Sequence, residues 1–249
     1  MAKSNLYSCL DKTPPQSLTG KLLRVVESQE QVATAELVSS LAAQQMLEAM
    51  LEQNKPVLRS ETLNLHYLLA TPFRYPPLQH GSRFGTRAET GIFYGSRTTT
   101  TVFSEAAYYR LLFYYGMSQP PPSRLKTQHS LFSVRYRSSK GYCLHSSPFA
   151  QYQSLISNPV NYAAPQKLGL AIRKKDATAF EYISARDSGH GINVGLFSAG
   201  ALATHKPDFI EPALCETDAD TVEFLHLGKL YSFTFVQFKI DGKLPTPAI

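Results

Sequence analysis

The sequence predicts an α+β fold with a mixed sheet. A chain of 249 residues, with 43% hydrophobic and 18% charged residues, has the composition of an ordinary globular protein that buries one substantial core. Short alternating segments typical of strands are separated by loops and by helical segments, which favours a mixed α/β or α+β core. Near the N-terminus, apolar residues recur at spacings of three and four, which indicates a helix outside the strand-rich part. We therefore expect one main α+β domain with an N-terminal helical extension.

The N-terminal part is expected to contain an arm and two helices. Residues 1–17 are polar, contain prolines and lack periodicity, so they should form a flexible, poorly fixed arm. Residues 18–59 should form the helical extension, with a short helix at 18–28 and a longer helix at 35–53. The apolar stripe of the longer helix either packs onto its own domain, which is the default, or docks a partner.

Residues 60–249 should form the main domain, in which strands and helices alternate. Residues 63–69 alternate like a strand that delivers the chain to Arg74. A short strand at 91–94 precedes a Thr-rich turn that suits the cap of a helix, with Glu105 near its first turn. The remaining elements expected in this domain are strands at 131–136, 179–184, 192–197 and 231–240, and short helices at 152–156 and 166–172.

Charge and composition argue against several functional classes. The net charge is +6, but lysine and arginine are spread along the chain without a dense basic block, so direct binding to nucleic acid is not expected. The N-terminus has no apolar signal region, and no apolar run approaches the ~20 residues that a membrane span needs. We therefore expect a cytoplasmic protein without membrane contact.

Cysteine and histidine usage gives no metal pattern. The three cysteines are far apart and lack the paired spacing of zinc knuckles or disulfide scaffolds. The seven histidines form no HxH or HExxH motif and are not joined by a cysteine pair. The sequence therefore predicts no metal site.

The stretch 73–105 contains the residues best suited to chemistry. It combines the arginines 74, 83, 87 and 97 with the aromatics Tyr75, Phe84, Phe93 and Tyr94, and it ends on the carboxylate of Glu105. Guanidinium groups bind phosphates through paired hydrogen bonds, and aromatic rings stack on flat heterocycles. This mixture favours an anionic nucleotide over an apolar ligand. No P-loop, Rossmann fingerprint or GxSxG elbow occurs, so side chains and irregular backbone must hold any nucleotide.

These residues resemble the RES-domain family. The resemblance rests on Arg74, on Arg83-Phe84-Gly85, on the Gly-x-Phe-Tyr-Gly run at 91–95, on Glu105 after the Thr run, and on the Ser-Ala-Arg-Asp run at 184–187. It continues through most of the chain after about residue 60. One departure is a valine at position 102, where the family usually has alanine, which leaves the carboxylate in place.

The resemblance implies a toxin of a bacterial toxin–antitoxin pair that destroys NAD or transfers ADP-ribose from it. It also implies a fold like that of ADP-ribosyltransferases, with residues 60–249 as the catalytic domain. The expected partner is an antitoxin, commonly an Xre-like helix-turn-helix protein. In this interpretation Glu105 stabilises the ribosyl cation as nicotinamide leaves, as an oriented carboxylate can.

The same resemblance assigns contacts with NAD. Arg74 and Arg83 would clamp the pyrophosphate, and Ser184 would hydrogen-bond the ribose or a phosphate. Tyr94 would stack on nicotinamide or order its ribose. Tyr75 and Arg186 complete the expected NAD contacts.

Three functions remain open. The first is an enzyme that cleaves the nicotinamide–ribose bond of NAD and passes ADP-ribose to phosphate or water. The second is an ADP-ribosyltransferase that modifies a protein target. The third is a non-enzymatic module that binds nucleic acid or a partner through the N-terminal helices. NAD turnover by the purified protein alone separates the first from the other two.

Overall fold

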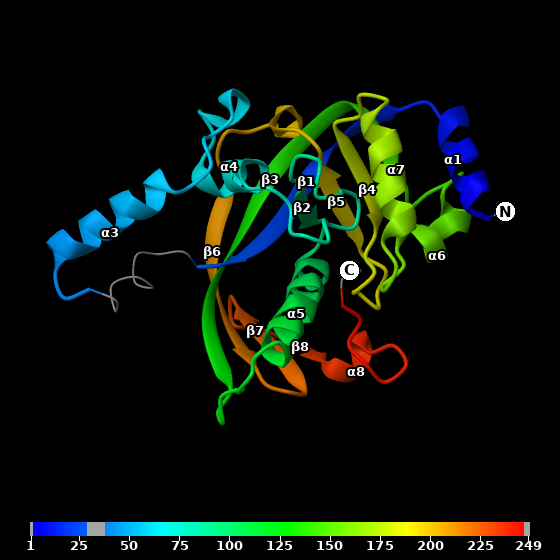
Figure 1. Ribbon diagram of the computed structural model, residues 1–249. Coiled ribbons are helices and arrows are strands. Elements are labelled where there is room, and N and C mark those ends of the chain that lie inside the picture. Colours follow the sequence, from blue (N-terminus) through cyan, green and yellow to red (C-terminus); the bar gives the residue numbers. More distant parts are fainter. Residues whose placement is uncertain (1, 29–37, 247–249) are drawn as a thin grey trace.

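The fold is built on one mixed sheet, shown in a computed structural model that describes residues 2–28 and 38–246 (Figure 1). The described residues contribute eight strands in the order β1-β2-β5-β4-β3-β6-β7-β8. All pairings are antiparallel except β3 with β4, which is parallel. The strands are β1 (Gln16–Glu27), β2 (Phe93–Ser96), β3 (Leu125–Cys143), β4 (Ala179–Ile183), β5 (Ile192–Leu196), β6 (Phe209–Thr217), β7 (Thr221–His226) and β8 (Lys229–Thr234).

Strand β1 closes part of this sheet into a ring. It pairs with β3 along nearly its whole length and also meets β2, where Leu23 lies opposite Ser96. Strands β1, β2, β5, β4 and β3 therefore form a closed circuit of pairings, and β6 to β8 continue from β3. Gly95 permits the close approach of β2, because a Cβ at this position would lie 2.6 Å from the backbone oxygen of Leu23.

Helices cover the sheet on different sides (Figure 1). Helices α1, α6 and α7 gather beside β4, α5 lies against β7 and β8, and α3 projects from the body. The helical elements are α1 (Ala2–Lys12), α3 (Leu41–Gln53), η1 (Ser60–Thr62), α4 (Tyr67–Arg74), α5 (Thr99–Tyr115), η2 (Ala150–Tyr152), α6 (Gln153–Ile156), α7 (Ala163–Arg173), η3 (Ala199–Ala201) and α8 (Phe235–Phe238). The predicted α+β class is confirmed, and the likeness to ADP-ribosyltransferases stays a prediction.

Helix α5 is the helix that the site depends on. Its first turn begins where the Thr98 hydroxyl accepts a hydrogen bond from the Thr101 amide at 3.2 Å, which is an N-cap. Its apolar side chains are buried against the β6–β8 part of the sheet, where the ring of Phe103 stacks on that of Phe224 at 4.6 Å between centroids. This packing of one face against the sheet fixes the position of the helix.

Three predictions for the N-terminal half are wrong. Residues 2–12 are not a poorly fixed arm but helix α1, whose Leu6 and Leu10 are buried in a core cluster with α7. Residues 18–28 do not form a helix, because this apolar segment belongs to β1 and pairs with the long strand β3. Residues 63–69 are not a strand, because the His66 side chain accepts a hydrogen bond from the Leu68 amide and begins α4.

Several later elements are confirmed with shifted ends. The strands expected at 131–136, 179–184 and 192–197 lie in β3, β4 and β5, and the helices expected at 152–156 and 166–172 correspond to η2 with α6 and to α7. The strand expected at 91–94 is β2. The strand expected at 231–240 is confirmed only up to Thr234, because residues 235–238 form α8. Strands β6 and β7 were not predicted. Glu105 lies in the second turn of its helix and not near the first, because α5 already begins at Thr99.

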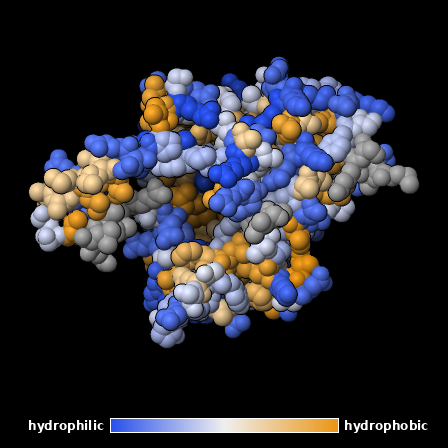
Figure 2. Space-filling model, in the orientation of Figure 1, coloured by the Kyte–Doolittle hydropathy of each residue, from blue (hydrophilic) through white to orange (hydrophobic). Residues whose placement is uncertain are grey.

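The predicted helix at 35–53 is observed as α3, and residues 35–37 lie outside the described residues. Its apolar residues Leu41, Met46, Met50 and Leu51 are exposed, so the expectation that they pack onto their own domain is wrong. Figure 2 shows hydrophobic side chains on the surface of this projecting helix. None of the described helices is both long and apolar enough to cross a bilayer.

The burial of α1 gives a stability prediction. Leu10 is 1% exposed and Leu41 is 89% exposed, so the two leucines form a matched pair. Leu10→Ala should lower the free energy of unfolding by about 2–5 kcal/mol, because it leaves a cavity in the core. Leu41→Ala should change it by less than ~0.5 kcal/mol. Urea denaturation measures both, and equal stability of the two variants would contradict the docking of α1.

Candidate active site

A cavity of about 500 Å³ opens between β1, β2, β5, helix α5 and the segment 75–83. This volume is in the usual range for small-molecule sites. Its lining includes Arg24, Tyr75, Arg83, Tyr94, Ser96, Glu105, Tyr109, Tyr162, Tyr182 and Asn193. The wall thus combines two cations, one carboxylate and several aromatic rings.

Two hydrogen bonds fix the carboxylate of Glu105. Its Oε1 accepts one hydrogen bond from the Ser184 hydroxyl and one from Nδ2 of Asn193, each at 2.6 Å. No hydrogen bond from a described residue reaches Oε2. The carboxylate is therefore held through one oxygen only.

Both donors are themselves oriented by neighbours. The Ser184 oxygen accepts hydrogen bonds from the amides of Arg186 and Asp187 at 3.1 and 3.0 Å, so its hydrogen must point toward Glu105. Oδ1 of Asn193 accepts from the Ser96 hydroxyl at 2.6 Å, which leaves the amide nitrogen to face Glu105. Ser184 is thus a residue that positions the carboxylate.

Two arginines bring positive charge to the cavity. The Arg83 guanidinium lies 4.5 Å from the ring centroid of Tyr162 and donates to the Asn158 carbonyl. Arg24 comes from β1, and its Nη1 donates to the Tyr94 carbonyl at 2.7 Å. Nε of Arg24 is buried without a partner among the described residues. Burial lowers the pKa of Arg24 to about 10, so the side chain still carries its charge at neutral pH.

Tyr94 connects the cavity wall to the Arg83 segment. Its hydroxyl accepts a hydrogen bond from the Phe84 amide at 3.1 Å and lies 3.0 Å from the Ser82 hydroxyl. Burial raises the pKa of Tyr94 to about 12, so the phenol is neutral at physiological pH. The side chain therefore contributes an aromatic surface and holds the loop, and it is not a general base. Tyr75, for which a contact with NAD was expected, also lines the cavity.

Arg74 and Arg186 are not among the residues that line the cavity. Arg74 ends α4 and forms an ion pair with Glu52 of α3 at 2.9 Å. Arg186 is buried, donates to the Pro159 carbonyl at 2.9 Å and lies over the ring of Tyr108. In the structure these two arginines contact other protein groups, and neither lines the cavity where NAD contacts were expected.

Sequence reasoning missed Arg24 and Asn193. Arg24 lies in the segment that was expected to form a separate helix, and only its pairing in β1 brings it to the cavity. Asn193 is a single buried polar residue in the apolar strand β5. A buried amide of this kind needs hydrogen-bond partners, and that requirement was the available signal.

A match to a known protein family includes most residues of this site. The model of the RES domain matches residues 56–216, which contain Glu105, Arg83, Ser184 and Asn193, whereas Arg24 precedes the match. A comparison with curated proteins gave no match. Because the family model spans more than half of the chain, the protein belongs to the RES-domain family, a family of NAD-acting enzymes linked to toxin–antitoxin systems.

Proposed function

We propose that this protein consumes NAD by cleaving the nicotinamide–ribose bond and transferring ADP-ribose to phosphate or water. The observation that carries the proposal is the Glu105 carboxylate, held at the cavity through Oε1 with Oε2 directed to no described partner. Membership of the RES-domain family supports NAD as the ligand.

The chemistry follows from a fixed negative charge beside a ribose. When the bond between the ribose carbon and the nicotinamide nitrogen breaks, both electrons leave with nicotinamide, which departs as a neutral molecule. The ribose is left with positive charge, which the Glu105 carboxylate stabilises. Ser184 and Asn193 already hold that carboxylate, so little reorganisation is needed as the charge develops. No general acid is required, which agrees with the hydrogen-bonded and neutral Tyr94.

The remaining groups suit the rest of the dinucleotide. Arg24 and Arg83 offer charge-assisted hydrogen bonds to the pyrophosphate. The rings of Tyr109 and Tyr182 offer surfaces for stacking against nicotinamide or adenine. Arg24 here replaces Arg74, which faces α3, as the second arm of the phosphate clamp.

The partner and the location are part of the same proposal. An enzyme that depletes NAD harms its own cell, so a cognate antitoxin must restrain it, and the family implies an Xre-like helix-turn-helix protein. We propose that the enzyme acts in the cytoplasm, together with its substrate and its antitoxin. The proposed reaction requires neither nucleic acid nor a membrane.

The function is tested by the products of NAD turnover. Purified protein should consume NAD without another macromolecule, and millimolar phosphate should accelerate the loss and yield phosphorylated ADP-ribose, because arginine-lined sites favour phosphate over water. Chromatography of the products with and without phosphate identifies the acceptor. ADP-ribose alone under both conditions identifies a glycohydrolase. Radiolabel from NAD on a protein band identifies a protein ADP-ribosyltransferase, and no NAD loss under any condition contradicts the proposal.

The proposed phosphate clamp is tested by substituting Arg24, which lines the cavity, and Arg74, which does not. Arg24→Ala should weaken binding of an unreactive NAD analogue about ten- to a hundredfold, because it removes a charge-assisted contact of roughly 1.5–3 kcal/mol. Arg24→Lys should restore this affinity only in part. Arg74→Ala is the matched control and should bind normally, since Arg74 pairs with Glu52 away from the cavity. Calorimetric titration measures the affinities, and a loss confined to the Arg74 variant would contradict the assignment.

A further inference from the structure

A second polar cluster lies on the opposite side of β4 from the cavity. Successive side chains of a strand point to opposite faces, and Tyr182 lines the cavity, so the neighbouring Glu181 points away from it. Glu181 is a carboxylate with 1% exposure. A buried carboxylate is costly unless it is paired, so its partners indicate what the cluster can bind.

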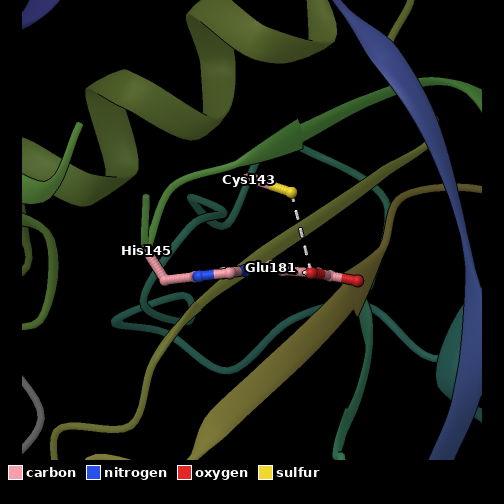
Figure 3. Close-up of side chains that lie close together, drawn as sticks. All are labelled: Cys143, His145 and Glu181. Carbon is pink, nitrogen blue, oxygen red and sulfur yellow. Dashed lines mark hydrogen bonds and ion pairs between the residues drawn. The ribbon is translucent and has the colours of Figure 1, made fainter. Parts of the chain in front are cut away.

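Two potential metal ligands face this carboxylate. Cys143 is the direct neighbour of Glu181 in the parallel pairing of β3 with β4, and His145 follows two residues later. Oε2 of Glu181 lies 3.1 Å from Nε2 of His145 and 3.8 Å from Sγ of Cys143. All three donor atoms lie within 4.8 Å of one another. Figure 3 shows the three side chains converging from the end of β3 and from β4.

We propose that Cys143, His145 and Glu181 bind one divalent transition-metal cation of the zinc class. Thiolate, imidazole and carboxylate are the ordinary donors for Zn²⁺, and three protein ligands leave a fourth position for water. Tetrahedral bonds of ordinary length place such donors roughly 3.3–3.6 Å apart, so small side-chain movements suffice here. The three residues form no sequence motif, because Glu181 joins Cys143 and His145 only through strand pairing.

The other oxygen of Glu181 is already oriented. Oε1 accepts hydrogen bonds from Nη2 of Arg97 at 2.5 Å and from the Tyr136 hydroxyl. Such outer contacts fix a ligating carboxylate and direct its second oxygen toward a metal. The Arg97 charge also opposes a bound cation, although its side chain is 40% exposed and partly screened by solvent. The site should therefore bind zinc more weakly than a closed site with four protein ligands.

The competing explanation is a closed ion-pair network. Arg97, Tyr136 and His145 all contact the carboxylate of Glu181 at hydrogen-bonding distance without any metal. Cys143 distinguishes the two explanations, because a thiol adds little to such a network, whereas a thiolate is a strong zinc ligand. Sulfur ligation is therefore the decisive readout.

The test uses the purified full chain after chelator treatment and removal of the chelator. Calorimetric titration with Zn²⁺ should show one equivalent bound, and Co²⁺ should give a thiolate-to-cobalt charge-transfer absorption. Cys143→Ser should abolish that absorption, and both Cys143→Ser and His145→Asn should lower the affinity at least ~10-fold. Cys9→Ser, which changes a thiol outside the cluster, is the matched control and should behave as the wild type.

Two results with the wild type and one with a variant would each overturn the metal proposal. Absence of zinc binding by the wild type, or a cobalt spectrum without thiolate absorption, would overturn the proposal, and neither result depends on a variant that folds. Equal zinc affinity in the wild type and in a folded Cys143→Ser protein, with folding checked by circular dichroism, would also overturn it.

Discussion

The site depends on one constraint, which is that a carboxylate facing a cavity must be held by donors that other elements supply. Glu105 comes from α5, Ser184 follows β4, and Asn193 lies in β5, so three segments must be placed correctly for the two hydrogen bonds to form. Each donor is oriented in turn, Ser184 by backbone amides and Asn193 by Ser96. The closed circuit of strands provides this placement, because β2, β4 and β5 are fixed to one another through continuous pairing. The position of the negative charge therefore depends on this circuit, which places Ser184 and Asn193, together with helix α5, which carries Glu105, and not on one loop.

Strand β4 gives the molecule two chemically different faces. Tyr182 belongs to the cavity that we assign to NAD, whereas Glu181 belongs to the cluster that we assign to a metal. The parallel pairing with β3 sets the register of both residues, since it places Cys143 beside Glu181. A slip of one residue in this register would exchange the two faces. The two assignments are therefore structurally linked through β4, although each has its own test.

The sequence predicts the fold class and much of the site, and its failures have physical causes. Glu105, Arg83 and Ser184 stand in short motifs that resemble those of the RES-domain family, and the structure brings Glu105 and Ser184 together. Arg24 was not predicted, because it reaches Tyr94 only through pairing between β1 and strands far along the chain. The apolar spacing of β1 also resembles a helix, and only the presence of the long partner strand β3 decides between the two. Arg74 stands in a family motif, yet its helix directs it toward Glu52 of α3, a contact that no local pattern reveals.

The most direct measurement of the central claim is single-turnover NAD cleavage by Glu105→Gln. Glutamine keeps the shape of glutamate, and its oxygen still accepts the hydrogen bonds of Ser184 and Asn193, so the variant removes the charge while it preserves the contacts. The account predicts at least a ~100-fold slower cleavage with an unchanged melting temperature. Glu89→Gln, outside the cavity lining, is the matched control and should cleave NAD at the wild-type rate. Wild-type cleavage by the folded Glu105→Gln protein would contradict the assignment of Glu105 as the group that stabilises the ribosyl cation.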